Sequence, residues 1–378
     1  MTYQASQPDH AAAKPAFRLS VLDKSPIAFG ESAADALARS VDLARAAETW
    51  GYHRYWFAEH HNTSALACPT PEILIAHVLA HTHRIRVGSG GVMLQHYSPY
   101  KIAENFNLLA ALAPGRVDMG IGKAPGGLPL STRALQGTND PSHRRDFTEL
   151  ASALNQYLRA TDPPAADGED NEAVLRATPL PPESAHPFLL GASVDSATLA
   201  AQLGWDFVYA AHINAAPADI ERAFDHYRSA SGGRAPLLAI SVVVADTRAE
   251  AARLADGFRR FRVQVGDAQA VNVGSLEQAH AFVRQSGGGA HRIEERETYI
   301  VHGTRDDALR ELGELQRRYG PAEFIVDTPV IEAAPRIASI RLLAGGHDAG
   351  NHSGHDSTHT ATDANPARAH HSLAVAEK

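Results

Sequence analysis

The chain alternates between short apolar runs and longer segments in which apolar residues recur every three or four positions. The short runs predict strands, and the longer segments predict amphipathic helices. Eight strands are expected, at 17–23, 52–58, 85–94, 116–122, 188–192, 206–211, 237–245 and 323–330. Helices are expected at 32–50, 71–82, 99–113, near 143–160, 196–204 and 218–228, with a long, mainly helical insertion at about 247–318.

Residues at the ends of these helices support the assignments. Ser32 and Asp35 have the spacing of a capping box at the start of the first helix, and Gly51 ends it. Pro99 stands at the first position of the helix that follows Ser98. These signals place the helix boundaries within a residue or two.

Continuous apolar strands that alternate with amphipathic helices indicate a parallel sheet covered by helices. Eight such units predict a (β/α)8 TIM barrel, whose active site would lie at the carboxyl ends of the strands. A doubly wound open sheet is the alternative. We expect the barrel over residues 16–344, with an exposed excursion at 161–187. Residues 1–15 and the His-rich residues 345–378 have little to bury and are expected to be disordered tails.

Composition narrows the class of protein. The chain has 378 residues, of which 44% are hydrophobic and 21% charged, as in an ordinary soluble globular protein. The net charge of −8 argues against a nucleic-acid binder. Cys68 is the only cysteine, which excludes an intrachain disulfide and argues against a cysteine-based metal site. No apolar run reaches the roughly 20 residues of a membrane span, and the first residues lack a secretion signal, so we expect a cytoplasmic protein.

The octet YWFAEHHN, residues 55–62, joins an aromatic segment directly to titratable side chains. Burying Glu59, His60 and His61 costs free energy unless each polar group has a partner. An apolar strand that ends in such groups resembles an active site at the carboxyl edge of a sheet. The alternative from the octet alone is a surface turn with two solvated histidines.

Polar residues follow other predicted strands at the same edge. Ser193 and Ser196 begin a helix, where free N–H groups and the positive helix end favour an anion such as phosphate. Lys123 could reach the same anion as a point charge. The alternative is that Ser193 or Asp195 only caps the helix. The sixth strand ends near His212.

Two glycine-rich stretches give weaker signals. In GIGKAPGG, residues 120–127, Pro125 stands where the dinucleotide fingerprint has its third glycine, and we find no other nicotinamide signature. Gly90-Gly91 lies inside a strand pattern, which suggests close approach of a flat ligand or an unusual backbone geometry.

Together these stretches resemble the bacterial luciferase-like family of flavin-dependent monooxygenases. The resemblance covers residues 17–343, and its most specific part is SPYKIAENFNLLAALAPGRVDMGIG, which joins a helix, a turn and a strand in family order. The family fold is a (β/α)8 barrel with inserted segments, in agreement with the strand count.

The resemblance implies roles for single residues. His60 matches the family's catalytic histidine beside the reactive edge of the flavin ring. Ser89, Gly90 and Gly91 match the segment behind the ring, where the family often has a cis peptide bond without proline. These four residues are the expected contacts of the ring.

Three further residues match the positions that bind the flavin phosphate: Lys123, Ser193 and Ser196. The family commonly has arginine at the first, and lysine lacks the bidentate fork of a guanidinium, which would weaken FMN retention. Gly122 stands where the light-emitting luciferases have a reactive cysteine, so luminescence is not expected.

The resemblance implies a monooxygenase that uses reduced FMN and O2 to oxidise a hydrophobic organic substrate such as a long-chain aldehyde. Without a nicotinamide site, reduced FMN (FMNH2) would come from a separate flavin reductase. The alternatives are an F420-dependent oxidoreductase with the same barrel and a non-catalytic flavin-binding protein, and the retained His60 argues against the latter. The substrate itself is not identified by the sequence.

A homodimer is also expected. The segments 71–82 and 100–113 are more apolar than the outer helices of a barrel need to be. Exposed apolar patches usually mark interfaces, and the family pairs these two helices across a twofold axis.

Overall fold

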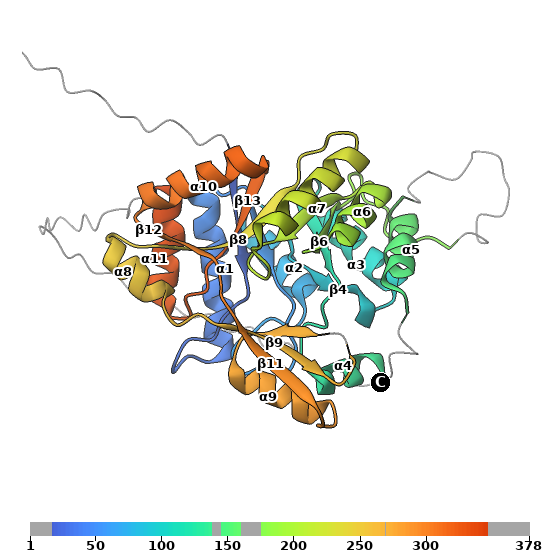
Figure 1. Ribbon diagram of the computed structural model, residues 1–378. Helices are drawn as coiled ribbons and strands as arrows, with labels where there is room; N and C mark the ends of the chain where they lie inside the picture. Colours follow the sequence, from blue (N-terminus) through green and yellow to red (C-terminus); the bar gives the residue numbers. More distant parts are fainter. Residues whose placement is uncertain (1–16, 138–144, 160–174, 269, 347–378) are drawn as a thin grey trace, which may run out of the picture. The chain divides into compact units, whose positions relative to one another are not determined.

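The computed structural model describes residues 17–137, 145–159, 175–268 and 270–346 (Figure 1). The tail expected at residues 1–15 lies outside these ranges, and so does the tail expected at 345–378, apart from Gly345 and Gly346. Most of the excursion expected at 161–187 also lies outside them.

Eight parallel strands close into a barrel, as the sequence predicts. Each strand pairs with the next along the chain, and the last pairs with the first, which excludes the open sheet. The strands are β1 (Arg18–Asp23), β2 (Arg54–Phe57), β3 (Arg86–Ser89) continued by β4 (Val92–Met93), β5 (Val117–Gly122), β6 (His186–Gly191), β7 (Asp206–Ala210), β8 (Leu237–Val244) and β13 (Glu323–Asp327).

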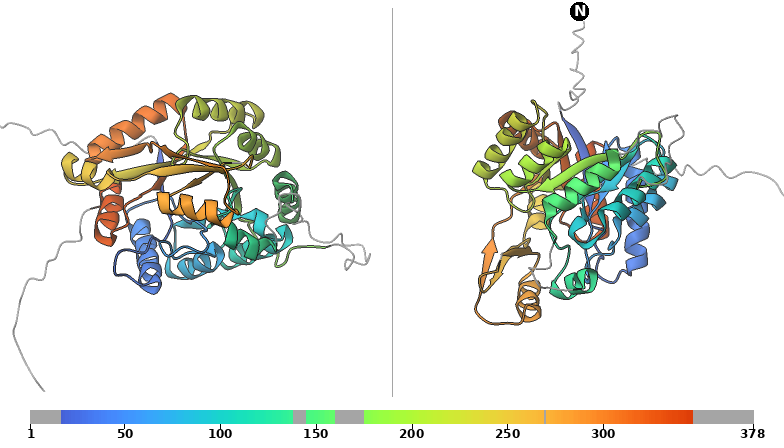
Figure 2. Two further views of the ribbon diagram at one scale, coloured as in Figure 1. Left: turned by 60° about the horizontal axis from the view of Figure 1, so that its bottom comes forward. Right: turned by 90° about the vertical axis from the view of Figure 1, so that its right-hand side faces the viewer.

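Helices between the strands surround the barrel (Figure 2). They are α1 (Ala33–Thr49), α2 (Pro71–His81), α3 (Pro99–Leu112), α5 (Phe147–Arg159), α6 (Val194–Leu203), α7 (Pro217–Ala230), α10 (Arg305–Tyr319) and α11 (Ala333–Ala344). The capping box expected at Ser32 and Asp35 is present at the start of α1. The helix boundaries expected from capping signals are therefore largely confirmed.

The third strand is interrupted where the sequence predicts a continuous one. The peptide bond between Gly90 and Gly91 is cis, and it separates β3 from β4. A Cβ on Gly90 would lie 2.5 Å from Cδ1 of Leu22, and one on Gly91 would lie 2.7 Å from the carbonyl oxygen of Gly120. The close approach to the backbone of β5 therefore requires glycine at position 91, whereas a side chain at position 90 would have to displace Leu22.

The expectation of a mainly helical insertion at 247–318 is wrong in its centre. Besides α8 (Arg248–Ala255), α9 (Leu276–Gln285) and α10, the segment contains an antiparallel sheet of β9 (Arg260–Val265), β10 (Val271–Val273) and β11 (His291–Arg296), and the strand β12 (Ile300–Gly303). Phe261, Val263 and Val265 alternate with polar residues and pack in one cluster with residues of α9. That period of two is typical of a half-buried strand.

A helix that the sequence reading missed, α4 (Pro129–Gln136), follows the glycine-rich loop after β5. The amide of Leu130 donates a hydrogen bond to the side-chain oxygen of Gln285 at the end of α9, at 3.1 Å. In Figure 1, α4, α9 and β9 lie at the end of the barrel where the parallel strands finish. These elements therefore flank the mouth at which a TIM barrel carries its active site.

A layer of ion pairs fills the opposite end of the barrel. Arg54 lies between two buried carboxylates, 2.9 Å from Asp118 and 2.7 Å from Glu323. The indole of Trp56 donates to Asp118 at 2.9 Å, and the hydroxyl of Ser20 donates to Glu323.

An apolar layer follows above these ion pairs. It consists of Leu22, Trp56, Ala58, Phe188, Val208, Leu237, Ala239 and Ile325. Because side chains fill the barrel interior at the amino ends and in the middle of the strands, an active site would have to lie at their carboxyl ends.

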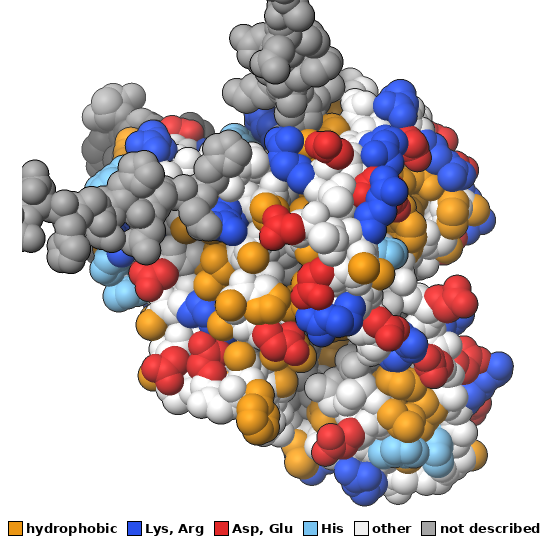
Figure 3. Space-filling model, turned by 90° about the vertical axis from the view of Figure 1, so that its left-hand side faces the viewer, with side chains coloured by type: hydrophobic (Ala, Val, Ile, Leu, Met, Phe, Trp, Pro, Cys, Tyr) orange, Lys and Arg blue, Asp and Glu red, His pale blue; other side chains and the backbone are white. Residues whose placement is uncertain are grey.

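The described residues show no helix typical of a membrane span and no metal cluster, and the face drawn in Figure 3 shows no feature typical of a nucleic-acid interface. Acidic and basic side chains are intermixed on the face seen in Figure 3, which shows no continuous basic stripe for a nucleic-acid backbone. Among the residues that the structure describes, no helix is long and apolar enough to cross a membrane. In the same part of the chain no three histidine, cysteine or acidic side chains gather as a metal ion would require.

Replacing Asp118 by asparagine should destabilise the fold strongly. Asp118 is buried and pairs with Arg54 and Arg86, so the substitution removes a counter-charge from the buried Arg54, which keeps only Glu323, and from the partly buried Arg86. Removing one partner of a buried pair costs about 3–5 kcal/mol. Urea denaturation should show this loss, whereas Asp42→Asn, in an exposed pair with Arg45, should leave the midpoint nearly unchanged. Equal midpoints for the two variants would contradict the role given to this layer.

Candidate active site

Four polar side chains meet at the carboxyl ends of the barrel strands. Lys24 follows β1, His60 follows β2, His212 follows β7, and Asp327 is the last residue of β13. The charges of Lys24 and Asp327 act on both histidines, which shows that the four groups share one site.

Alternation along the strands explains why these side chains point inward. Leu22 and Ile325 belong to the apolar layer inside the barrel, and Lys24 and Asp327 stand two residues further along the same strands. In the second strand Trp56 and Ala58 are interior, so the same alternation carried past the end of β2 directs His60 inward.

Lys24 and Asp327 form an ion pair at the base of this site. Nζ of Lys24 lies 2.6 Å from Oδ2 of Asp327, and Asp327 is 1% exposed. Burial lowers the pKa of Lys24, and the charge of Asp327 offsets only part of that effect. Burial alone would raise the pKa of Asp327, but the charge and hydrogen bond of Lys24, together with other nearby positive charge, outweigh it and hold the pKa below its ordinary value. Oδ1 of Asp327 is buried and has no hydrogen-bond partner among the described residues.

His60 and His212 are both neutral at pH 7. Burial, and after it the charge of Lys24, lowers the pKa of His60 to about 4 and the pKa of His212 to about 3. The Nδ1 atom of each ring is buried and has no partner in the described ranges. Each histidine can therefore offer a neutral ring nitrogen to a ligand or take up a proton from it.

His61 has a different role from His60. Glu59 is fully buried and accepts hydrogen bonds from the ring of His61 at 2.6 Å, the hydroxyl of Tyr97 at 2.8 Å and the amide of Met93 at 3.0 Å. The backbone amide of His61 donates to the carbonyl of Gly126 at 2.8 Å. Glu59 thus fixes His61 as part of the wall, and its carboxylate has no hydrogen bond to the ring of His60 in the described part of the chain.

The two serines proposed to bind phosphate lie together at the start of α6. Their hydroxyl oxygens are 3.1 Å apart, and the side chain of Ser193 accepts a hydrogen bond from the amide of Ser196. Ser193 is therefore the N-cap of α6, and the phosphate role expected for it stays a prediction. Lys123 is exposed beyond the end of β5, the strand that pairs with β6, and among the described residues it has no hydrogen bond with either serine.

The segment expected behind the flavin ring is tied to the neighbouring strand. Ser89 is buried, and its hydroxyl both donates to the carbonyl of Gly120, at 2.8 Å, and accepts from the amide of Gly120, at 3.0 Å. Both hydrogen bonds of the Ser89 hydroxyl are thus made to the backbone of β5. Any contact between Ser89, Gly90 or Gly91 and a flavin would come from their backbone.

These features fit a flavin. Its ring system presents N–H donors, ring nitrogens and carbonyl oxygens, which match the unpartnered nitrogens of His60 and His212. The free amides at the start of α6 suit a phosphate. Lys123, Ser193, Ser196 and the backbone at 89–91 are the groups that could hold the rest of the cofactor.

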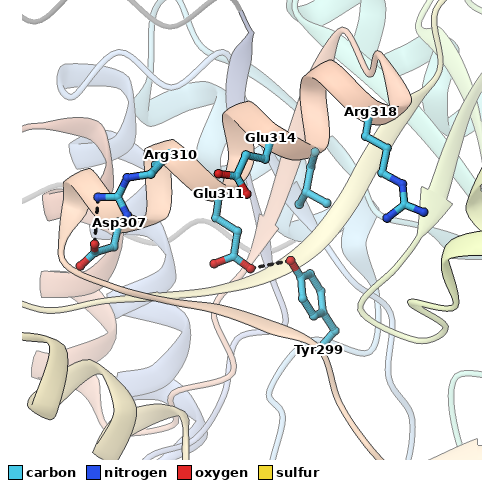
Figure 4. A pocket seen from close by; sticks show the side chains of 7 residues that line it. Tyr299, Asp307, Arg310, Glu311, Glu314 and Arg318 are labelled. Atoms are coloured by element: carbon cyan, nitrogen blue, oxygen red, sulfur yellow. Dashed lines mark hydrogen bonds and ion pairs between the residues drawn. The ribbon is translucent and has the colours of Figure 1, made fainter.

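A second hollow lies on the outside of the barrel, over α10 (Figure 4). Its lining includes Tyr299 and Asp307, but no residue at the carboxyl ends of the barrel strands. Its polar groups are largely paired with one another, since Tyr299 donates to Glu311 and Arg310 to Asp307. It is not a candidate active site.

Lys24 and Asp327 were not singled out from the sequence, although a signal for each was present. Lys24 stands directly after an apolar run, and Asp327 is a charge inside the run EFIVDTPV. Both occupy positions that alternation places inside the barrel. His212 was noted only as a polar residue after the sixth strand.

Comparison with known proteins agrees with this architecture. The family model described as "Luciferase-like monooxygenase" matches residues 17–343. An N-acetyl-S-alkylcysteine monooxygenase of Bacillus subtilis is 42% identical over 86% of this chain and 97% of its own length.

A luciferase-like monooxygenase of Escherichia coli is 40% identical over 61% of this chain and 68% of its own length. The crystal structure of apo-MsnO8 superposes with a TM-score of 0.68 at 32% identity, covering 87% of this chain and 97% of that one. This chain belongs to the luciferase-like monooxygenase family.

Proposed function

We propose that the protein is a flavin-dependent monooxygenase that uses reduced FMN and O2 to oxidise a hydrophobic organic substrate. The observation that carries this proposal is the neutral His60, with a free ring nitrogen, at the barrel mouth of a member of this family. A separate flavin reductase would supply the reduced FMN.

When bound, the flavin supplies the reaction with oxygen. The protein's own contribution is binding, orientation and proton handling. His60 accepts or returns a proton at Nδ1, for which a neutral imidazole is suited. Lys123, Ser193 and Ser196 hold the phosphate. The apolar layer below the site and the elements α4 and α9 beside it limit access of water.

Two substrate classes are supported to different degrees. A long-chain aldehyde follows from the resemblance to the luciferase-like family. The Bacillus subtilis relative, by its name, oxidises N-acetyl-S-alkylcysteines, which makes an S-alkylated cysteine derivative a second candidate.

The test of this function is cofactor binding followed by product analysis. Purified protein should bind FMN more tightly than F420. With reduced FMN, O2 and a panel of aldehydes and thioethers, it should form an oxygenated product detectable by mass spectrometry. Tighter binding of F420 would favour the alternative that the protein is an F420-dependent oxidoreductase. Flavin binding without any product across the panel would favour a non-catalytic role.

The two adjacent histidines should differ in their effect on turnover. His60→Ala should lower product formation about a hundredfold or more, the usual scale for loss of a positioned acid–base group, while FMN affinity changes only a fewfold. His61→Ala should act mainly through flavin affinity or stability, because His61 is a wall residue held by Glu59. Product formation and hydrogen peroxide release measured together would separate the two. Equal loss of turnover in both variants would remove His60 from its proposed role.

The phosphate assignment predicts a selective loss of affinity. Lys123→Ala should weaken FMN binding about tenfold and leave riboflavin binding unchanged, since a charge-assisted contact to phosphate is worth about 1.5 kcal/mol at an exposed site. Fluorescence titration of both flavins gives the comparison. Lys101→Ala, at an exposed lysine of α3, serves as the control. A parallel loss of riboflavin affinity would show that Lys123 does not bind the phosphate.

We also propose a homodimer formed through α2 and α3. Three large apolar side chains are exposed on these helices: Ile73 at 71%, Leu108 at 51% and Leu112 at 69%. Apolar patches of this kind usually mark protein interfaces.

Charged substitutions on this patch should give a monomer. Ile73→Glu combined with Leu112→Glu places carboxylates where the proposed partner would bury them, which opposes association. Light scattering at micromolar concentration should show a dimer for the unaltered chain and a monomer for the double variant. Leu276→Glu, on α9, should remain a dimer. A monomeric unaltered chain would rule the interface out.

A further inference from the structure

One cation beside the barrel mouth has no partner. Arg260 is the first residue of β9, and it is only partly exposed. In Figure 1, β9 lies at the end of the barrel where the parallel strands finish, and the charge of Arg260 acts on Lys24, His60, His212 and Asp327, so Arg260 lies near the candidate site. Yet in the described part of the chain the guanidinium of Arg260 forms no hydrogen bond or ion pair, although its backbone lies in the ladder with β11.

The neighbouring acids are already engaged. Glu294, on the strand paired with β9, forms ion pairs with Arg292 at 2.5 Å and Arg296 at 3.8 Å. Glu295 pairs with Arg259 at 2.9 Å. The sheet that carries Arg260 therefore supplies no free carboxylate to neutralise it.

The site as a whole has an excess of positive charge. Among the four side chains of the candidate site and Arg260, Lys24 and Arg260 are cations, Asp327 is the single anion, and both histidines are neutral at pH 7. Asp327 is already 2.6 Å from Lys24, so the Arg260 charge has no counter-charge at the mouth. A partly buried guanidinium is well suited to bind a carboxylate.

A second, independent observation also indicates a ligand. Asp327 is 1% exposed, and its Oδ1 atom has no hydrogen-bond partner among the described residues. A buried acceptor of this kind is costly unless a donor reaches it. A ligand with an N–H group close to a carboxylate would satisfy both Asp327 and Arg260.

We propose that Arg260, with Lys24, binds the carboxylate of the organic substrate, and that Asp327 accepts a hydrogen bond from an adjacent N–H of the same molecule. This inference rests on the proposed monooxygenase function and names its substrate class: small N-acylated amino acids and related carboxylates with an oxidisable side chain. Arg260 and Asp327 determine specificity, and His60 remains the residue assigned to proton handling.

The flavin phosphate is the other anion that Arg260 could bind. The groups assigned to the phosphate stand at the ends of β5 and β6, whereas Lys24 and Asp327 stand at the ends of β1 and β13. In the strand order of the closed barrel these two pairs of strands lie on opposite sides. Arg260 is therefore assigned to the substrate.

The experiment compares an acid with its neutral amide. Calorimetric titration of the protein with N-acetyl-S-benzyl-L-cysteine and with the corresponding amide measures the preference for the carboxylate. We expect at least a tenfold preference, which Arg260→Gln abolishes while affinity for the amide stays the same. Because the guanidinium of Arg260 has no partner among the residues that the structure describes, this substitution leaves none of their buried groups unpaired. Arg262→Gln, an exposed arginine two residues further along the same face of β9, should keep the preference.

Three outcomes would overturn the proposal. The first is that the unaltered protein binds the acid and the amide equally, or binds neither. The second is that Arg260→Gln weakens binding of the acid and the amide to the same degree. The third is that Arg260→Gln weakens FMN binding much more than riboflavin binding. Since the titration needs no turnover, it is independent of the proposed reaction. A preference for the acid without oxygenated product would leave the carboxylate subsite standing and contradict the monooxygenase function. If the protein oxidises neutral substrates but shows no preference for the acid, the monooxygenase function would stand and the carboxylate subsite would be contradicted.

Discussion

The buried pairs of Arg54 with Asp118 and Glu323 are the constraint on which the rest of the barrel depends. They join β2, β5 and β13, strands from the beginning, middle and end of the chain, at one level inside the barrel. Charges at this depth are tolerated only with good geometry and full pairing, so they permit one arrangement of these strands and penalise others. The apolar layer above them closes the interior. The active groups can then stand only at the opposite end.

The same alternation of side chains that builds these layers also separates two adjacent histidines. His60 continues the interior row of β2, whereas His61 turns back to the buried Glu59. Tyr97 and Met93 complete the bonding of that carboxylate. The two adjacent histidines therefore differ: among the described residues the Nδ1 atom of His60 has no partner, whereas the ring of His61 is hydrogen-bonded to Glu59.

Local patterns predicted most of the barrel, and they failed where distant residues decide the outcome. The capping box of Ser32 and the apolar strands needed only neighbouring residues to be recognised. The strand pattern of 260–265 was overlooked because it is short, half polar and set between helices. The Lys24–Asp327 pair joins residues 303 positions apart, and only closure of the barrel brings them together. The roles assigned to His60, Lys123, Ser193 and Ser196 came from family resemblance rather than from periodicity.

The segment from β9 to β11 that carries Arg260 forms a separate sheet with no strand in the barrel, where β8 and β13 pair directly with each other. The wall of the barrel is therefore complete without it. Its sheet packs against α9 in a hydrophobic cluster separate from those of the barrel. Sequence change in this segment can alter which molecules enter the mouth while the layers beneath keep their packing. Substrate range and barrel stability can thus evolve, or be engineered, almost independently in this protein.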